Sequence, residues 1–330
     1  MTVKHAFLGL IVLVIAGGGW IAHYLTTPVP LPATPFEFSV KPGTTLRGVA
    51  QQLAQAGAVA HPFLFTWVAR LSGKGTALKA GNYALETALT PWDLLQKLTK
   101  GDVTQNEVKF IEGWTFRQMR QALDRAPGLQ HETQGLSPAE IMARLGFPEQ
   151  HPEGRFFPDT YFFSSGMSDL ALLARAHKLM HAQLESAWRD RAPNLPYVTP
   201  DEALIMASIV EKETGQASER PMIAGVFVNR LRIGMLLQTD PTVIYGLGET
   251  FDGNLRRRDL LADTPYNTYT RGGLPPTPIA MPGLGALQAA LQPAETKALY
   301  FVARGNGSHQ FSSTLAQHNQ AVNRYQRNQK

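Results

Sequence analysis

The longest uncharged stretch of the chain lies near its N-terminus and constrains every later interpretation. Residues 6–25 read AFLGLIVLVIAGGGWIAHYL, without Asp, Glu, Lys or Arg. About 20 apolar residues in one helix span a hydrocarbon core of roughly 30 Å. Lys4 precedes the stretch and the next basic residue is Lys41, an asymmetry that places the N-terminus in the cytoplasm and the rest of the chain outside. We therefore expect residues 1–25 to form a cytoplasmic tip and a single-pass transmembrane helix.

A cleaved signal peptide is the alternative for this segment, because residues 16–18 (AGG) resemble a small-residue processing site. The apolar run continues through Trp20 to Tyr24, an aromatic residue suited to the membrane interface, and this favours a retained anchor. Either interpretation exports the folded part of the chain. A net charge of +5 alone permits nucleic acid as a partner, but export removes the chain from it. The absence of cysteine excludes disulfides, thiolate metal sites and a cysteine nucleophile.

Four prolines mark the next segment, residues 26–35 (TTPVPLPATP), as a linker. Proline-rich chains favour an extended geometry of about 3.1 Å per residue, so this linker would separate the membrane from the next domain by roughly 30 Å.

Residues 36–101 are predicted to form a small module of strands and helices. FEFSV alternates like a strand, and the following helix turns Leu46, Val49 and Leu53 inward before it ends at Gly57. GNYALET is a second strand, and a helix begins at Thr90-Pro91 and ends at Gly101. This order resembles a LysM-type glycan-binding module, although a generic scaffold of strands and helices would show the same pattern.

The remaining residues, 102–330, are predicted to form one larger α+β domain. NEVKFIEGWT predicts a strand that opens into a helix, residues 136–191 are mostly helical around the segment PEGRFFPDTYFFSSG, and helices follow between 199 and 233. The last third is rich in Gly and Pro and indicates loops. The fold class expected from the sequence is therefore α+β.

One helix of this domain, in TPDEALIMASIVEKETG (199–215), ends in two glutamates that flank a lysine. Thr199 and Glu202 form a capping box around Pro200, and Gly215 is the predicted stop. Glu211 continues the apolar stripe of the helix, whereas Glu213, two residues on, points about 200° away from that stripe. A carboxyl on an apolar stripe is desolvated, which raises its pKa and suits a proton donor. A solvated helix end is the simpler alternative.

Several long segments of the chain, taken together, resemble one family. ASIVEKETGQASERPMIAGVFVNRLRIGMLLQTDPTVIYGLG, TPYNTYTRGGLPPTPIAMPG, FVARGNGSHQFSSTLAQHN and the earlier EGRFFPDTY are similar to the endolytic murein transglycosylases of the MltG, or YceG-like, family. The order of anchor, LysM-like module and these segments extends the resemblance over essentially the whole chain.

The resemblance implies a lyase of the bacterial inner membrane, with a single-pass anchor and a periplasmic catalytic domain. The implied substrate is the glycan strand of peptidoglycan, cut within the chain at the MurNAc–GlcNAc bond to leave 1,6-anhydro-MurNAc ends. The implied catalytic residue is the first glutamate of EKET, Glu211, acting first as acid and then as base, without cofactor or metal. The enzyme would terminate nascent strands beside peptidoglycan synthases. Reliance on a single carboxyl group distinguishes this chemistry from ordinary glycosidases, which use two.

Six polar or aromatic residues in these segments are candidates for contacts with the sugar. They are Gln238, Asp240, Tyr266, Asn267, Tyr269 and His309. Asp240 serves equally well as the N-cap of a short helix, the TPYNTY segment as a structural loop, and His309 as a structural histidine. Glu219 and Arg230, also shared with the family, are interpreted as a buried ion pair that supports the site.

The sequence also bears on a metal site and on two rival functions. His177 and His181 are spaced like metal ligands on a helix, but no HExxH pattern or third ligand accompanies them, so no metal is expected. The main rival to an enzyme is a non-catalytic, membrane-anchored scaffold that binds peptidoglycan. A hydrolase that leaves reducing ends is the second rival.

Overall fold

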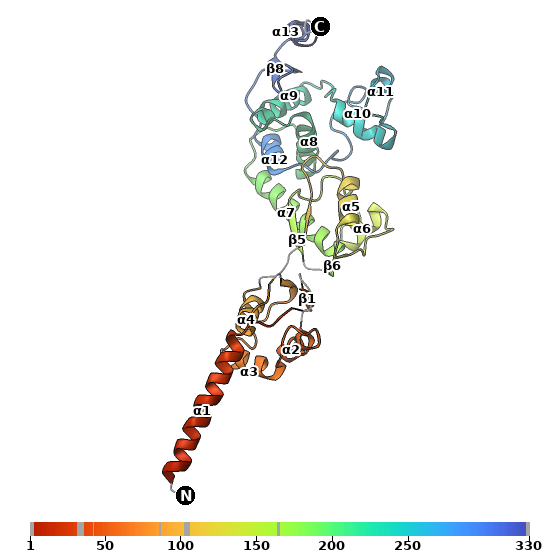
Figure 1. The fold of residues 1–330 in the computed structure, drawn as a ribbon. Helices are drawn as coiled ribbons and strands as arrows, with labels where there is room; N and C mark the ends of the chain where they lie inside the picture. The colour runs from red at the N-terminus through yellow and green to blue at the C-terminus, as the bar shows by residue number, and fades with distance from the viewer. Residues whose placement is uncertain are drawn as a thin grey trace. The chain divides into compact units, whose positions relative to one another are not determined.

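The structure, a computed structural model, describes residues 3–31, 36–41, 43–85, 87–101, 106–163 and 166–327, and the side chains of residues 3–14, 37 and 82 lie outside this description. The chain divides into two compact units, Met1–Asn106 with Phe162–Gly166, and Glu107–Tyr161 with Met167–Lys330 (Figure 1). The predicted α+β class is confirmed, because helices combine with small two-stranded sheets.

The first unit begins with a long helix, α1 (Val3–Thr26), which covers the predicted anchor. Within the described part of the chain, no helix combines the length and the apolar character that crossing a bilayer requires. The side chains of residues 6–14 lie outside the described residues, so the anchor stays a prediction.

The module that follows has the order β1 (Phe36–Val40), α2 (Leu46–Gln55), α3 (Pro62–Leu71), β2 (Gly81–Leu85) and α4 (Pro91–Lys100). The strands pair antiparallel with Phe38 opposite Tyr83, and the two rings stack in the core. The predicted inward residues of α2 are buried, and Gly57 follows the helix end with φ of 79°. These strands and α2 confirm the predicted elements.

Two features of the first unit differ from the sequence prediction. Helix α3 was not predicted. His61 precedes it without a side-chain cap, so Pro62 is the only sequence feature that indicates a helix start there. The proline-rich segment was interpreted as an extended stand-off, but Val29 forms an antiparallel bridge with Leu89 and thus lies against the module. The second half of that segment, residues 32–35, lies outside the described residues.

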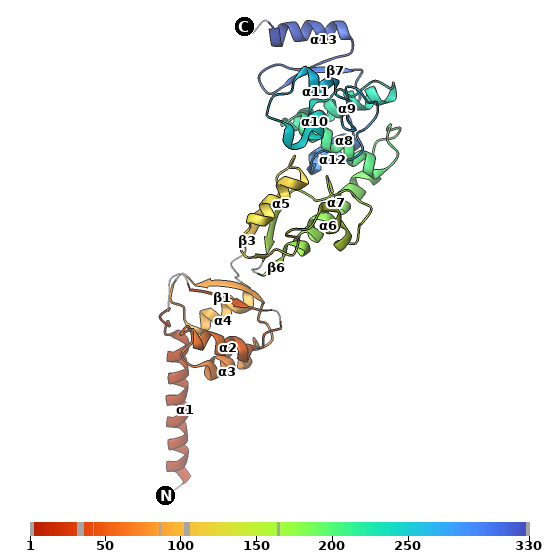
Figure 2. The same cartoon turned by 90° about the vertical axis from the view of Figure 1, so that its right-hand side faces the viewer.

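The second unit is built around helix α8 (Pro200–Glu213), which packs against α7 (Asp169–Arg189), α9 (Arg220–Arg232), α10 (Asp240–Leu247) and α12 (Leu284–Leu291) (Figures 1 and 2). Residues 203–210 of α8 are all buried, as its nearly uniform apolar sequence predicts. The predicted capping box of Thr199 and Glu202 is present. Because four helices enclose α8, only its last turn reaches the polar surroundings of the site.

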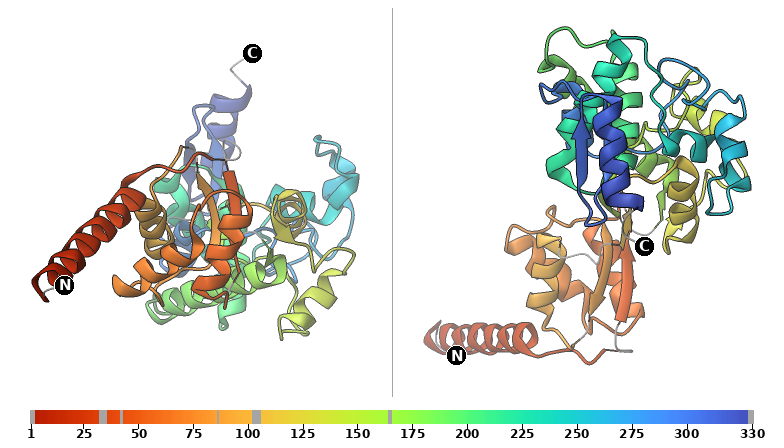
Figure 3. Two further views of the ribbon diagram at one scale, coloured as in Figure 1. Left: turned by 60° about the horizontal axis from the view of Figure 1, so that its bottom comes forward. Right: turned by 90° about the horizontal axis from the view of Figure 1, so that it is seen from above.

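Shorter elements complete the second unit. They are β3 (Asn106–Lys109), α5 (Phe116–Arg125), β4 (Leu129–Gln130), α6 (Pro138–Arg144), β5 (Thr160–Phe163), β6 (Met167–Ser168), η1 (Ala217–Glu219), η2 (Gly248–Thr250), α11 (Arg257–Leu261), β7 (Tyr300–Ala303), β8 (His309–Ser312), α13 (Leu315–Val322) and η3 (Asn323–Arg327). β3 pairs with β5, β4 pairs with β6, and β7 pairs antiparallel with β8. Helix α13 packs along the β7–β8 pair (Figure 3).

The segment between α11 and α12 closes over the end of α8 without regular secondary structure. Its backbone is held from two sides: Ser208 Oγ accepts a hydrogen bond from Ile279 N, 3.0 Å away, and the backbones of Met281 and Trp114 are joined by a 2.7 Å bond. Gly113 N donates to Met281 O as well, at 2.9 Å. Residues 279–283 therefore join α8 to the loop that precedes α5.

Candidate active site at the end of helix α8

The last turn of α8 carries both glutamates of the EKET segment. The helix ends at Glu213, and Thr214 follows as an extended C-cap with φ of −146°, so the stop falls before the predicted Gly215. The two carboxyl groups face different surroundings, as their spacing predicts. Lys212 between them donates from Nζ to Gly113 O at 3.2 Å.

Glu211 is enclosed by donors. Its Oε1 accepts a hydrogen bond from Arg220 Nη2 at 2.9 Å, and its Oε2 accepts one from the backbone N–H of Gly283, also at 2.9 Å. The Glu211 side chain is only 5% exposed. Burial raises the pKa of Glu211, whereas the Gly283 amide and the Arg220 guanidinium favour its ionised form. Both oxygens of this carboxylate are thus occupied by groups of the protein itself.

A second carboxylate shares the arginine. Glu112 Oε2 lies 3.5 Å from Arg220 Nη2, and its charge also raises the pKa of Glu211. A Cβ atom on Gly283 would lie 1.9 Å from Glu112 Oε1, and one on Gly285 would lie 2.6 Å from Arg220 Nη1. The two glycines of MPGLG therefore leave the space that this charge cluster occupies.

Glu213 is half-buried and differently placed. Its Oε1 accepts a hydrogen bond from Thr239 Oγ1, and it forms no ion pair with any residue that the structure describes. Burial raises the pKa of Glu213, the Thr239 hydrogen bond lowers it, and the nearby charge of Asp240 raises it again. The more distant charges of His309 and Arg230 lower the pKa of Glu213. Burial of such a carboxyl group, without a paired cation among the described residues, favours its protonated form.

Three of the predicted sugar contacts lie around Glu213 rather than Glu211. Asp240 is the first residue of α10, and its Oδ1 accepts a hydrogen bond from Tyr269 Oη at 2.5 Å. His309, at the start of β8, pairs through Nδ1 with Glu219 Oε2 at 2.7 Å. Asp240 is not an N-cap, because that position belongs to Thr239, one residue earlier.

The three other candidates are dispersed. Gln238 is exposed beside Thr239 and has φ of 49°. This left-handed conformation is costly for a residue with a side chain, and such conformations cluster at functional sites. Tyr266 packs its ring against Tyr245 and shares a hydrogen bond with Thr277. Asn267 is buried with its amide bonded to three backbone carbonyls of residues 259–262. The prediction that Asn267 contacts substrate is therefore wrong, because its donors are already used.

The interpretation of Glu219 and Arg230 as one ion pair is also wrong. Glu219 pairs with His309, and Arg230 is buried with its guanidinium donating to the backbone oxygens of Leu237, at 2.6 Å, and Leu299, at 2.7 Å. Arg230 thereby holds the loop that leads to Thr239.

The contacts of Glu211 bear on its predicted role as the proton donor. A general acid must carry a proton and reach the substrate, but the Glu211 carboxylate is shielded from solvent and paired with an arginine. Glu213 has no paired cation among the described residues and lies close to the candidate sugar contacts. The apolar stripe of α8 identified the glutamate whose two oxygens are bonded to Arg220 and to the Gly283 amide.

Sequence reasoning missed Arg220, Thr239, Glu112 and Glu153. Arg220 and Thr239 are neighbours of the candidates Glu219 and Asp240, so the quoted segments contained them without a signal that distinguished them. Glu112 and Glu153 each precede a glycine, in EGWT and EGRF, and this shared pattern was the available indication.

Glu153 is a further buried carboxyl group of the second unit. It is 4% exposed; Oε1 accepts from the Phe116 amide at the start of α5 at 2.9 Å, and Oε2 accepts from Tyr245 Oη at 3.1 Å. Burial raises the pKa of Glu153 to about 7. Glu153 therefore links the loop before α5 to α10 and takes up a proton near neutral pH.

We expect Glu153→Gln to stabilise the protein increasingly as the pH rises. The folded state keeps its proton up to a pKa of about 7, while the unfolded state loses it near 4.5, so wild-type stability falls between these values. Relative to wild type, the variant should gain about 3 kcal/mol of unfolding free energy between pH 4.5 and pH 8. Urea denaturation at several pH values measures this difference. Glu149→Gln, an exposed site, controls for charge removal, and equal slopes in both variants would contradict the prediction.

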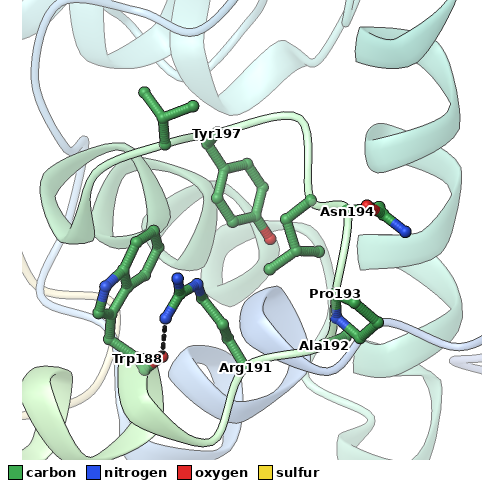
Figure 4. A pocket seen from close by; sticks show the side chains of 8 residues that line it. Trp188, Arg191, Ala192, Pro193, Asn194 and Tyr197 are labelled. Carbon is green, nitrogen blue, oxygen red and sulfur yellow. Dashed lines mark hydrogen bonds between the residues drawn. The ribbon is translucent and has the colours of Figure 1, made fainter.

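A pocket of about 470 Å³ lies at the opposite end of α8 from the glutamates (Figure 4). Trp188, Arg191 and Tyr197 line it, and the Arg191 guanidinium stacks 4.1 Å from the centre of the Trp188 ring. The 14 residues of α8 separate this pocket from the last turn by about 20 Å. It is therefore not part of the candidate active site.

Comparison with known proteins places this architecture in a defined class. A model of the YceG-like family matches residues 38–324, and the chain belongs to this family. A protein of Bacillus subtilis (strain 168) named endolytic murein transglycosylase is 31% identical over 339 residues, which cover 95% of this chain and 91% of the relative.

A Streptococcus pneumoniae protein of the same name (serotype 2, strain D39) is 28% identical over 337 residues, which cover 90% of this chain but 60% of the relative. The 2.6 Å crystal structure of a yceG-like protein from Listeria monocytogenes matches with a TM-score of 0.56 and 28% identity, over 86% of this chain and 98% of that one. The family predicted from the sequence segments is thereby confirmed.

Proposed function

We propose that this chain is an endolytic murein transglycosylase in which Glu213 transfers the protons. One observation carries the assignment of the residue: Glu213 is a half-buried carboxyl group with a raised pKa and no ion-pair partner among the described residues, next to Asp240, Tyr269 and Thr239. Membership of the YceG-like family and the names of two relatives support the substrate class.

The reaction needs only one carboxyl group. Protonated Glu213 donates to the oxygen of the MurNAc–GlcNAc bond as the bond from that oxygen to C1 breaks. The 6-hydroxyl of the same MurNAc then closes on C1 and gives its proton to the Glu213 carboxylate, which restores the acid. No water is consumed, and the product carries a 1,6-anhydro end. A raised pKa suits both steps, because the group must start protonated and then act as a base.

The neighbours of Glu213 have separate tasks in this proposal. Thr239 orients the carboxyl group, and Asp240 disfavours its ionisation while it fixes the Tyr269 ring. Exposed Gln238, held in its left-handed conformation beside them, offers an amide to the sugar. Glu211 and Arg220 hold the last turn of α8 against residues 279–283 and do not touch the substrate.

The location of the reaction is part of the proposal. Residues 6–25 would anchor the chain in the inner membrane with a cytoplasmic N-terminus, and the second unit would work in the periplasm. Residues 36–101 would bind glycan as a LysM-like module, a role that the β–α–α–β order of β1, α2, α3 and β2 supports. Cleavage close to the membrane would terminate nascent strands beside the synthases that make them.

The product distinguishes the proposal from its rivals. The full chain in detergent is incubated with peptidoglycan, and the fragments are analysed by mass spectrometry. We expect internal cleavage with 1,6-anhydro ends. Products heavier by one water per cut would indicate a hydrolase, and unaltered strands from folded protein would indicate a binding scaffold; either result would reject the proposed reaction.

Asp240→Asn should shift the pH dependence of cleavage. Glu213 must be protonated to act as the acid, so activity falls as the pH rises through its pKa. The Asp240 charge contributes to raising that pKa, and asparagine keeps the oxygen that accepts from Tyr269. We therefore expect the alkaline limb of the kcat profile to move to lower pH in the variant. A limb that stays in place while the maximal rate falls would assign Asp240 a purely structural role.

A further inference from the structure

Helix α3 presents an apolar surface to solvent although its opposite face is already in the core. Phe65 and Ala69 are buried among the residues of the first unit. On the other side Phe63, Trp67 and Leu71 are 76%, 46% and 81% exposed. These three follow one another at every fourth position, so they form a continuous stripe along the helix. A helix that is apolar on both faces is expected to be covered on both.

Helix α2 of the same module shows what an ordinary solvated face looks like. Its outer positions at the same spacing are Arg47, Gln51 and Gln55, all polar and exposed, over a core face of Val49 and Leu53. The contrast between two neighbouring helices of equal length shows that the apolar stripe of α3 is not a general property of the module.

The stripe lies next to the end of α1. The ring of His61, the residue before α3, is 5.8 Å from the Trp20 ring and 5.7 Å from the Tyr24 ring, and Tyr24 Oη donates to His61 O at 3.3 Å. Tryptophan and tyrosine at the end of a membrane-spanning helix mark the bilayer interface. At about 1.5 Å per residue, Leu71 lies within roughly 15 Å of that level. Figures 1 and 2 show α3 on the side of the module from which α1 projects.

The charge of the module fits an anionic surface. Residues 36–101 contain seven Lys and Arg against three Asp and Glu, a net charge of +4. Exposed Arg70 lies at the C-terminal end of the stripe, and Lys74, whose Nζ is 4.9 Å from the centre of the Trp92 ring, follows it. Long basic side chains at such a position suit contact with lipid phosphates. Amphipathic helices that lie in the plane of a membrane combine Trp, Phe and Leu with flanking basic residues in this way.

We propose that the α3 stripe, Phe63, Trp67 and Leu71, lies in the outer interface of the same membrane that holds α1, with anionic phospholipid as its occupant. The proposal rests on the proposed anchor. It gives the first unit two attachments, one spanning the bilayer and one resting on it. The module is then held with a fixed face towards the lipid and not suspended from a single helix.

The test uses single cysteines, because the natural chain has none and each label is therefore unique. Full-length Phe63→Cys and Leu71→Cys carry a nitroxide label and are reconstituted into vesicles of phosphatidylethanolamine and phosphatidylglycerol. Gln51→Cys on α2 is the matched control, and Ile15→Cys reports on α1. Electron paramagnetic resonance compares collisions with oxygen, which concentrates in lipid, and with a water-soluble nickel chelate.

We expect the labels at 63 and 71 to be relaxed several-fold more by oxygen than by the nickel chelate, and the label at 51 to show the reverse. Water-like labels at 63 and 71 with a lipid-like label at 15 would overturn the α3 proposal and leave the anchor intact. A water-like label at 15 would overturn both. Labels at 63 and 71 shielded from both agents would mean that a second copy of the protein covers the stripe, which also overturns it. None of these outcomes depends on the cleavage reaction, which the product analysis tests separately.

Discussion

Glu213→Gln is expected to abolish strand cleavage while the protein stays folded. The substitution keeps the shape of the side chain and an oxygen that accepts from Thr239, but it removes the proton that the leaving oxygen requires. General acid catalysis contributes about 10²- to 10⁴-fold to a rate, and the same group also serves as the base, so we expect a loss of at least about 10³-fold in kcat. The measurement is the rate at which anhydro ends appear.

Glu211→Gln is the matched control, because it is the same change two residues earlier on the same helical turn. Both Glu211 oxygens are already bonded to Arg220 and to the Gly283 amide, so we expect less than about a 10-fold loss of kcat per folded molecule. Circular dichroism establishes the folded fraction of each variant. If Glu211→Gln were inactive and Glu213→Gln active, Glu211 would be the catalytic residue that the family resemblance implies, and the proposed role of Glu213 would be wrong.

Arg220→Gln should produce the largest loss of stability among the substitutions considered. Arg220 is 13% exposed, and its removal leaves the buried Glu211 carboxylate without its cation and Glu112 nearby with the same charge. Breaking one side of a buried pair costs about 3–5 kcal/mol because the remaining charge is uncompensated. Urea denaturation followed by circular dichroism, at a pH near 8 where carboxyl groups are ionised, measures the change.

The double variant Glu211→Gln/Arg220→Gln distinguishes loss of the ion pair from loss of packing. With both charges removed, two amides remain that form a neutral hydrogen bond, so most of the lost stability should return. If the double variant were as unstable as the sum of the two single variants, the charge pair would not be the cause.

Much of the fold could be predicted because local signals and tertiary structure agree. Thr199, Pro200 and Glu202 define the start of α8 from the sequence alone, and the alternation of FEFSV gives a strand whose inner residues are buried. Helix α3 was not predicted because its local sequence pattern does not match that of a solvated helix. Its outer face is apolar where a solvated helix is polar, so the usual periodicity is absent.

The site was harder to predict because its contacts join residues that are distant in sequence. Periodicity correctly separated the two glutamates onto different faces but could not reveal that Arg220 and the Gly283 amide occupy the one on the apolar stripe. Likewise, the amide side chain of Asn267 makes it a candidate sugar contact in the sequence. Only the fold shows that this amide already donates to three backbone carbonyl groups. Functional assignment from residue type therefore depends on which polar atoms remain unused.

The hydrogen bonds of residues 279–283 bear on when the enzyme becomes competent. Three of these bonds join residues that are synthesised at different times: Ser208 with Ile279, Trp114 with Met281, and Glu211 with Gly283. The second partner of each pair lies in the last fifth of the chain and is therefore synthesised late. A nascent polypeptide emerging N-terminus first can assemble its first unit early, but the corner around α8 closes only when synthesis is nearly complete. A partly synthesised chain that lacks residues 279–283 would therefore lack the closed corner around α8.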